Sequence, residues 1–231
     1  MSSDSTATAA HHTGRGEPEL LKLPMLRRAM ARRLTEAALV PCFYLRRSAD
    51  VSGLFAARAR LREAGAGGVP SVNDYVIHAA AAALRKHPGA NSSWADGELE
   101  LHPRVNVGVA IAIPDGLVVP AIYDADRLEP AAIAATSRAL AESAAARRLS
   151  REELRDATFT VSNLGMFGIE DFDPVINPPQ AAILGVGAAT AEADGRRLLR
   201  LTLGCDHRVL TGAEGAEFLA TVKAGLEEVG S

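Results

Sequence analysis

The sequence predicts an α+β fold, a two-layer sandwich built on a mixed β-sheet. Amphipathic stretches typical of helices and apolar stretches typical of strands both occur, but they do not alternate strictly, as a doubly wound parallel fold requires. The chain of 231 residues is 48% hydrophobic and 23% charged, which suits one large domain with a full core. The sequence contains no internal repeat, phosphate-binding loop or dinucleotide fingerprint, so those architectures have no support.

The first predicted elements are two helices separated by a strand. Residues 26–39 place apolar side chains at helical spacing, and Pro41 ends this helix because a proline disfavours helical conformation in the residue before it. The run 43–51 follows as a strand. Ser52 then provides the N-cap of a helix through 54–64, which a loop rich in glycine terminates.

A third helix and a hairpin come next. Ser71 and Asp74 have the spacing of a capping box and predict a helix over 71–87, whose alanine-rich face indicates close packing. Residues 94–102 predict a short hairpin, because an Asp-Gly pair at 96–97 favours a tight turn between two strands.

The second half of the chain contains most of the predicted strands. Apolar runs bounded by turn residues predict strands at 105–113, 117–124, 158–162, 181–188 and 197–203. Asp-Gly turns at 115–116 and 194–195 join the first two and the last two of these. An alanine-rich amphipathic helix covers 129–147, and a final helix starts near Thr211.

Charge and hydropathy argue against several classes of partner. A net charge of −3 gives no broad attraction to nucleic acid or to an anionic membrane, so we expect neither as a partner. The chain has no run of about 18 apolar residues, and its first residues are small and polar, which predicts a cytoplasmic protein. Residues 1–19 lack hydrophobic periodicity and are expected to form a disordered tail before a single domain over 20–231.

The sequence does not predict a metal site. Cys42 and Cys205 lie far apart without metal-ligand spacing, and we interpret them as reduced structural thiols. His11 and His12 are adjacent and offer two ligands, but a mobile tail is the preferred interpretation of that segment.

The sharpest local feature is a histidine in the segment CDHRVLTG, residues 205–212, between a predicted buried strand and a helix N-terminus. A histidine has an ordinary pKa near 6.5 and therefore accepts a proton around neutral pH, as activation of a hydroxyl or thiol requires. A single histidine flanked by Asp and Arg is, by itself, more often structural. His207 thus needs support from the rest of the sequence.

That support comes from motifs in the same order as in a known family. They are LRRAMARRL, VPCFYL, SVNDYVIHAAAAALRKHPGANSSW, VNVGVAIAIPDGLVVPAI, TFTVSNLGMFGIEDFDPVINPPQAAILGVGA and DHRVLTGAEGAEFL. From about Leu23 onward the chain resembles the catalytic domain of the dihydrolipoyl acyltransferases of 2-oxo acid dehydrogenase complexes. The resemblance identifies 20–231 as an acyltransferase catalytic domain.

The resemblance implies a chloramphenicol-acetyltransferase-like fold, a homotrimer with active sites at the subunit interfaces, and acetyl-CoA or coenzyme A as co-substrate. It assigns His207 as the general base that takes a proton from the acceptor. It assigns Ser162 as the hydroxyl that donates to the oxyanion, a contribution of about 2.7–4 kcal/mol. The chemistry requires no metal, and the resemblance leaves the coenzyme A contacts and any assembly beyond a trimer open.

Four positions depart from the family pattern. Thr211 stands four residues after His207, where the family has Asp or Asn that orders the active-site loop. Thr211 and Glu214 keep the spacing of a capping box, so we expect an ordered loop with an altered charge balance, and reduced activity or an altered acceptor as possible consequences. Cys42 replaces a common histidine, and Asp-Ala at 156–157 replaces glycines; either change can reshape an acceptor channel or be neutral.

The sequence contains no lipoyl domain and no lipoyl-lysine motif, and this favours a freestanding enzyme without an attached lipoyl group. The favoured hypothesis is an acetyl-CoA-dependent O-acetyltransferase that acts on a hydroxyl of a small metabolite, such as a tetronate or polyketide intermediate in antibiotic biosynthesis. One alternative is an S-acyltransferase that works with a lipoyl or carrier domain in trans. Others are a non-catalytic oligomeric scaffold, which Thr211 favours, and a repurposed fold that catalyses elimination or cyclisation.

Overall fold

The computed structural model describes residues 18–114 and 116–230. The helices are α1 (Met25–Ala37), α2 (Ser52–Glu63), α3 (Val72–Lys86), α4 (Pro130–Ala145) and α5 (Gly212–Glu227). The strands are β1 (Cys42–Asp50), β2 (Ser92–Ala95), β3 (Glu98–Leu101), β4 (Val107–Val109), β5 (Ile111–Ile113), β6 (Gly116–Val118), β7 (Ala121–Ile122), β8 (Phe159–Asn163), β9 (Ala182–Ala191) and β10 (Arg197–Asp206). Short 3₁₀ turns are η1 (Pro88–Asn91), η2 (Ala125–Arg127) and η3 (Gly165–Phe167).

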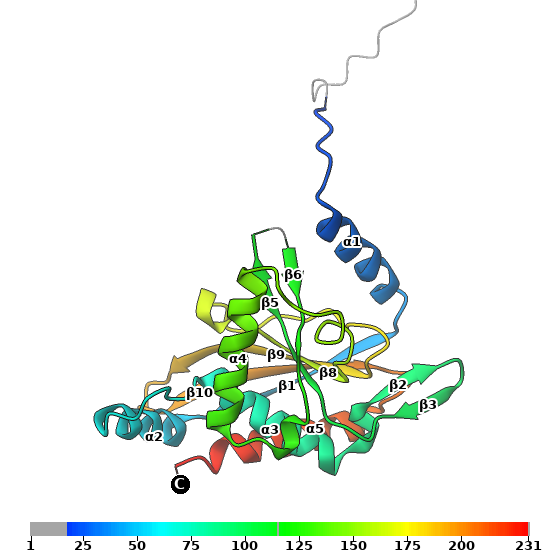
Figure 1. Cartoon of the computed structure of the whole chain (residues 1–231). Coiled ribbons are helices and arrows are strands. Elements are labelled where there is room, and N and C mark those ends of the chain that lie inside the picture. The colour runs from blue at the N-terminus through cyan, green and yellow to red at the C-terminus, as the bar shows by residue number, and fades with distance from the viewer. Residues whose placement is uncertain (1–17, 115, 231) are drawn as a thin grey trace, which may run out of the picture.

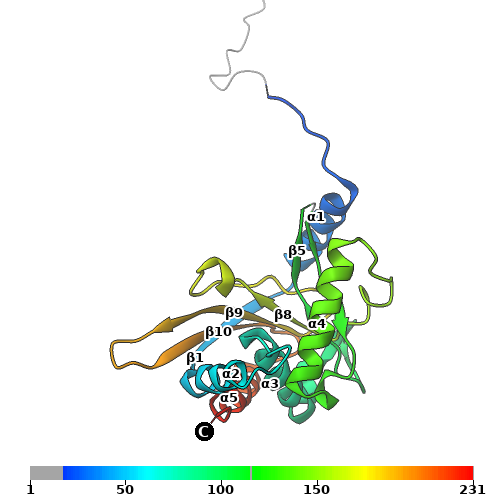
Figure 2. The ribbon, with the colours of Figure 1, turned by 60° about the vertical axis from the view of Figure 1, so that its left-hand side comes forward.

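The prediction of an α+β sandwich with a mixed sheet is confirmed. Within the described residues, six strands form the main sheet in the order β1-β10-β9-β8-β4-β7. Strand β8 runs parallel to both β9 and β4, and the other neighbouring pairs are antiparallel. Helices α2, α3 and α5 cover one face of this sheet, whereas no α-helix covers the opposite face between β1 and β8 in the part of the chain that the structure describes (Figures 1 and 2).

The core lies between the sheet and these helices. Its largest side chains are fully buried and include Phe159 of β8, Leu184 of β9, Leu203 of β10 and Phe218 of α5. The rings of Phe159 and Phe218 lie 5.5 Å apart and tie α5 to the middle of the sheet. Each such side chain contributes about 1.5–3 kcal/mol by leaving water, so the core holds β8 and β10 firmly.

Two of the three predicted helix caps are confirmed. Ser71 with Asp74 and Thr211 with Glu214 form complete capping boxes at α3 and α5. The prediction for Ser52 is wrong, because this residue is the first helical residue of α2 rather than its cap. The Ser52 amide and hydroxyl donate to the Asp50 carboxylate at 3.0 and 2.6 Å, and the hydroxyl accepts the Arg197 amide at 2.9 Å instead of an amide of the first turn.

The predicted strands at 105–113 and 117–124 are each broken into two. Their outer parts, β4 and β7, pair in the main sheet, whereas β5 and β6 form a separate hairpin that rises from the body beside α1 (Figure 1). Pro120 has no amide to donate to a ladder, and its carbonyl accepts from the Val109 amide at 2.9 Å where the chain changes direction. Asp115, half of the predicted turn, lies outside the described residues.

The predicted hairpin at 94–102 is confirmed as β2 and β3, with positive φ angles of 44° at Asp96 and 98° at Gly97. Most of the predicted tail lies outside the described residues, which begin at 18. Residues 18–24 extend away from the body ahead of α1 (Figure 1). Among the described residues, no helix is both long and apolar enough to cross a membrane.

Candidate functional site

Ser162 lies on the face of the sheet that the helices leave open. It borders a cavity of about 590 Å³ whose other walls come from α1, β6 and the segment 172–180. Its strand neighbour Thr160 faces the same cavity and donates to Gln180 Oε1 at 2.6 Å. Across residues 18–114 and 116–230 the Ser162 hydroxyl has no hydrogen-bond partner, so it is free to donate to a bound group.

The turn after Ser162 is fixed by its own side chains. Asn163 accepts the Gly165 amide at 2.8 Å and donates to Asn73 of α3 at 2.9 Å. A methyl group on Gly165 would lie 2.4 Å from the Gly187 carbonyl oxygen, so only glycine allows this close approach to β9. The NLG turn thus holds the end of β8 against the neighbouring strand.

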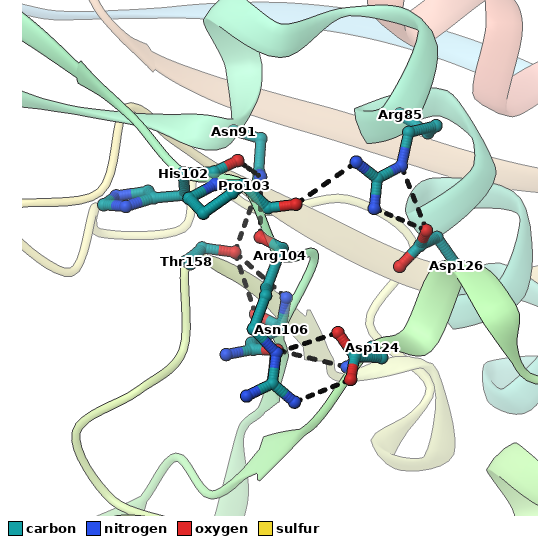
Figure 3. Close-up of polar contacts among 9 residues, drawn as sticks. All are labelled: Arg85, Asn91, His102, Pro103, Arg104, Asn106, Asp124, Asp126 and Thr158. Carbon is teal, nitrogen blue, oxygen red and sulfur yellow. Dashed lines mark hydrogen bonds and ion pairs between the residues drawn. The ribbon is translucent and has the colours of Figure 1, made fainter.

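The start of β8 is anchored by a buried hydrogen-bond network (Figure 3). The Thr158 hydroxyl donates to Asn91 Oδ1 at 2.6 Å and accepts from the Asn106 amide at 3.1 Å. Asn91 in turn donates to the carbonyls of His102 and Arg104 at 3.0 and 2.9 Å. Because buried polar groups without partners are costly, this network fixes β8 relative to β4 and to the β2–β3 hairpin.

Two ion pairs lie beside this hydrogen-bond network (Figure 3). Arg104 contacts Asp124 through two nitrogens at 2.9 and 2.6 Å, and these hydrogen bonds lower the pKa of Asp124. Arg85 of α3 contacts Asp126 at 3.0 and 2.7 Å. We interpret both contacts as support for the strand that carries Ser162.

His207 follows the last residue of β10 and is exposed. Its amide donates to the Pro41 carbonyl at 2.9 Å, and its ring centroid lies 4.5 Å from that of Phe43. Its chain neighbours are tied together, because Arg208 forms a bidentate pair with the buried carboxylate of Asp206 at 2.6 and 2.9 Å. The backbone around His207 is therefore held in place while the imidazole stays open to a partner.

A cation–π contact extends this support to the β2–β3 hairpin. The Arg208 guanidinium lies 5.2 Å from the ring centroid of Trp94. The hydrogen bond to Asp206 raises the pKa of Arg208, so this residue stays charged throughout the accessible pH range. Trp94, Arg208 and Asp206 thus form a continuous support beneath the loop of His207.

Thr211 uses its hydroxyl for the helix cap. It accepts the Glu214 amide at 3.3 Å and donates to Glu214 Oε2 at 2.7 Å, and that carboxylate oxygen also accepts the Thr211 amide at 2.8 Å. These hydrogen bonds, the backbone one first, lower the pKa of Glu214. Thr211 therefore begins α5 four residues after His207 and contacts Glu214 rather than the imidazole.

One chain does not bring His207 and Ser162 together. Ser162 pairs with Gly185, Gly185 pairs with Thr202, and Thr202 precedes His207 by five residues along β10. Strand geometry converts this register into about 17 Å along the strands and about 10 Å across them, a separation of ~19 Å. Groups that act on one carbonyl must both lie roughly 3 Å from it, so His207 and Ser162 of a single chain cannot act on the same carbonyl.

A family model described as 2-oxoacid dehydrogenases acyltransferase (catalytic domain) matches residues 15–231. The chain belongs to this family. The acyltransferase domain is 38% identical over 213 residues to a dihydrolipoyllysine-residue acetyltransferase component of pyruvate dehydrogenase complex from Rickettsia bellii, covering 87% of this chain and 51% of that protein. It is 40% identical over 239 residues to the mitochondrial component 3 from Arabidopsis thaliana, covering 98% and 43%. The chain thus spans about half the length of these curated relatives.

Solved structures give the same assignment. The Azotobacter vinelandii dihydrolipoamide acetyltransferase superposes with a TM-score of 0.89 at 32% identity, with 98% of each chain covered. That structure comes from a crystallographic and enzymatic investigation of a serine, a histidine and an asparagine in its catalytic mechanism. Chloramphenicol acetyltransferase matches with a TM-score of 0.56 at 15% identity, covering 84% of this chain and 94% of that one, a likeness of fold alone. The predicted family and fold are confirmed.

The thiols of the acyltransferase domain are unpaired, as predicted. Burial raises the pKa of Cys205 to about 12 and also raises the pKa of the half-buried Cys42. Both therefore stay protonated at neutral pH and are poor nucleophiles. Among the described residues, no three His, Cys, Asp or Glu side chains gather into a potential metal site, and His11 and His12 lie outside those residues.

The sequence left open which of several side chains line a substrate pocket, namely Cys42, Phe43, Tyr44, Phe167 and Phe172, and it did not predict that α1 forms one wall. Of the aromatic side chains near the site, Phe172 lines the cavity beside Ser162, whereas Phe43 packs against His207. Apolar side chains of α1, such as Leu26 and Met30, close the opposite wall. Helical periodicity predicts α1 but not where its apolar face packs, because that contact joins segments more than a hundred residues apart.

Proposed function

We propose that this domain transfers an acyl group between coenzyme A and a thiol or hydroxyl acceptor, at a site shared between two copies of the chain. The observation that carries the proposal is an open histidine and an unpartnered serine hydroxyl, each on a supported loop or strand, in a member of the acyltransferase family. Within the Azotobacter enzyme the named histidine and asparagine lie four residues apart, as do His207 and Thr211.

In the proposed reaction, His207 takes the proton of the acceptor S–H or O–H as the acceptor attacks the thioester carbonyl. The carbonyl oxygen becomes negative, and the Ser162 hydroxyl donates a hydrogen bond to it. Collapse of the tetrahedral intermediate breaks the carbon–sulfur bond of the thioester. The coenzyme A thiolate leaves and receives the proton from His207, so the base is restored for the next turnover.

A homotrimer explains the separation of ~19 Å between the two groups, because a neighbouring copy supplies the missing half of each site. Two surfaces support this assembly. The open face of the sheet carries the Ser162 cavity, and the segment before α1 exposes apolar side chains, with Leu20 at 93% and Leu21 at 77% exposure. Apolar surface of this kind on an extended segment is suited to a protein contact, and a second copy of the chain is the proposed occupant.

The proposed reaction does not by itself identify the acceptor that receives the acyl group. The names of the curated relatives favour a dihydrolipoyl thiol, presented by a lipoyl domain in trans or within a longer chain. The hydroxyl of a small metabolite, which the sequence favoured, uses the same base and the same oxyanion donor. We propose the dihydrolipoyl thiol as the first acceptor to test and the hydroxyl as its competitor.

The test is coenzyme A release from acetyl-CoA by wild type, His207→Ala and the control His78→Ala, with dihydrolipoamide and with a panel of hydroxylated metabolites. His78 is a half-buried histidine of α3, outside the lining of the Ser162 cavity. We expect release with dihydrolipoamide that disappears in His207→Ala and persists in His78→Ala. Release only with alcohols would assign the hydroxyl acceptor instead. A folded wild type that is inactive with every acceptor would contradict the proposed function and favour a scaffold.

A further inference from the structure

The segment 169–176 lies directly on the open face of the sheet. Two glycines of β9 permit this contact: a methyl group on Gly187 would lie 1.9 Å from the Glu170 carbonyl oxygen, and one on Gly185 would lie 3.1 Å from Pro174 Cδ. The Ala188 amide also donates to the Ile169 carbonyl at 2.7 Å. The segment is therefore a wall of the cavity rather than a loop that projects into solvent.

One arginine holds this wall from the neighbouring strands. Arg46 of β1 donates from Nε to Asp171 at 2.8 Å, and its Nη2 contacts Asp173. The Thr202 hydroxyl of β10 donates to the other carboxylate oxygen of Asp171. Burial alone would raise the pKa of Asp171, but the hydrogen bonds from Thr202 and Arg46 outweigh it and lower that pKa. Both carboxylates of the wall thus converge on one guanidinium.

The residue between these two carboxylates faces the site. Phe172 lines the Ser162 cavity, and its Cζ would lie 3.3 Å from a methyl group on Gly185. Gly185 is the register partner of Ser162 on the adjacent strand, about 4.8 Å away. The ring therefore borders the place where a carbonyl bound to Ser162 would carry its acyl chain.

We propose that Arg46 is a positioning residue: by holding Asp171 and Asp173, it fixes Phe172 at the distance from Ser162 that limits the acyl group to a short chain. The inference rests on the proposed acyl transfer and adds its specificity. Without the guanidinium, the two carboxylates lose their shared counter-ion and repel each other, so the wall yields to larger groups. A hydrophobic pocket discriminates between acyl groups by about 10–200-fold in kcat/KM for each methylene. A wall that moves aside for larger acyl groups loses this discrimination.

The test compares Arg46→Ala with Arg47→Ala. Arg47 is the next residue on β1, also exposed, and its side chain points to the other face of the sheet. Each protein is assayed with acetyl-, butyryl- and hexanoyl-CoA, and amide hydrogen exchange is measured for peptides that cover 169–176. We expect Arg46→Ala to lower the acetyl-to-hexanoyl ratio of kcat/KM by about 10-fold or more. We also expect faster exchange in 169–176 and an acetyl kcat that changes little, whereas Arg47→Ala matches wild type in every readout.

Ionic strength provides a second arm, because all three charged side chains are partly exposed and salt screens such pairs. Raising the salt concentration to about 1 M should move the wild-type ratio toward that of Arg46→Ala and leave the variant unchanged. An unchanged ratio in Arg46→Ala, with or without faster exchange, would overturn the inference, as would an equal change in Arg47→Ala. A wild-type protein that transfers no acyl group from any acyl-CoA would refute the proposed function itself. This outcome differs from an unchanged acetyl-to-hexanoyl ratio, which refutes only the role of Arg46.

Discussion

Replacing Thr211 separates the role of the α5 cap from the proposed catalytic role of His207. In Thr211→Ala, α5 loses the hydroxyl that accepts the Glu214 amide at 3.3 Å and donates to its carboxylate at 2.7 Å. The contact from the residue 211 amide to that carboxylate, at 2.8 Å, does not depend on the side chain. The perturbation thus removes half of a capping box and leaves His207 in place.

The expected cost follows from the cap. Replacing an N-cap threonine by alanine costs about 1 kcal/mol. For a protein of this length that corresponds to a fall in Tm of about 2–4 °C. Hydrogen bonds from Thr211 lower the pKa of Glu214 below its ordinary 4.5, so its stabilising effect is complete above that pH and is lost as the pH falls through the lowered value. The difference between wild type and Thr211→Ala should therefore be full at pH 7 and shrink below about pH 4.5.

The assay is thermal unfolding followed by circular dichroism, paired with acyl transfer. Thr211→Asn keeps a capping side chain and should retain wild-type stability. Thr136→Ala is the matched control, because its hydroxyl lies within α4 and, among the described residues, donates only to the Ala132 carbonyl, at 3.0 Å. We expect a change within about 0.5 kcal/mol. Activity of Thr211→Ala should fall less than tenfold. A variant as stable as wild type, or one as inactive as His207→Ala, would refute this interpretation of Thr211.

Three further changes test other parts of the structure. Ser162→Ala should lower kcat by about 10²–10³-fold with an unchanged Tm, and an active variant would remove Ser162 from the mechanism. Gly187→Ala places a methyl group 1.9 Å from the Glu170 carbonyl oxygen and should cost about 1–3 kcal/mol in urea unfolding, whereas Gly212→Ala meets no atom within 4 Å and should be neutral; equal effects would contradict the packing. Burial raises the pKa of Cys205 from 9.0 to about 12, so the thiol of the unfolded chain ionises first, and the free energy of unfolding should fall as the pH rises from 9 toward 12. Labelling of Cys205 by iodoacetamide in the folded protein at about pH 8 would show that the thiol is not buried.

Local chemistry determines most of what the sequence predicted correctly. Capping pairs such as Ser71 with Asp74 act within one helical turn, and the Asp-Gly turn at 96–97 acts within one hairpin, so both are visible in the sequence. Ser52 shows the limit of this reasoning. Its hydroxyl donates to the nearby Asp50 carboxylate and accepts the amide of Arg197, which lies 145 residues further along the chain, so no local sequence pattern reveals this contact.

The sequence proposes residues for the candidate site but not their geometry. The order of the motifs proposes Ser162 and His207 as site residues, yet their separation depends on strand register in β8, β9 and β10, which joins residues distant in the sequence. The sequence carries one indication of the wall formed by 169–176, which is the alternation of Gly185 and Gly187 in β9. Alternating glycines indicate that another segment approaches one face of a strand, but they do not identify that segment.

The central claim, a site completed by a second copy of the chain, is tested most directly by complementation. Ser162→Ala and His207→Ala chains carry different affinity tags, are produced together in equal amounts, and are purified through both tags. Every trimer that carries both tags has about one interface in three that joins an intact Ser162 to an intact His207, so an interfacial site predicts about a third of wild-type activity from two variants that are each nearly inactive alone. Mixed assemblies as inactive as the single variants would contradict the claim, because a site built within one chain cannot be restored by its neighbour.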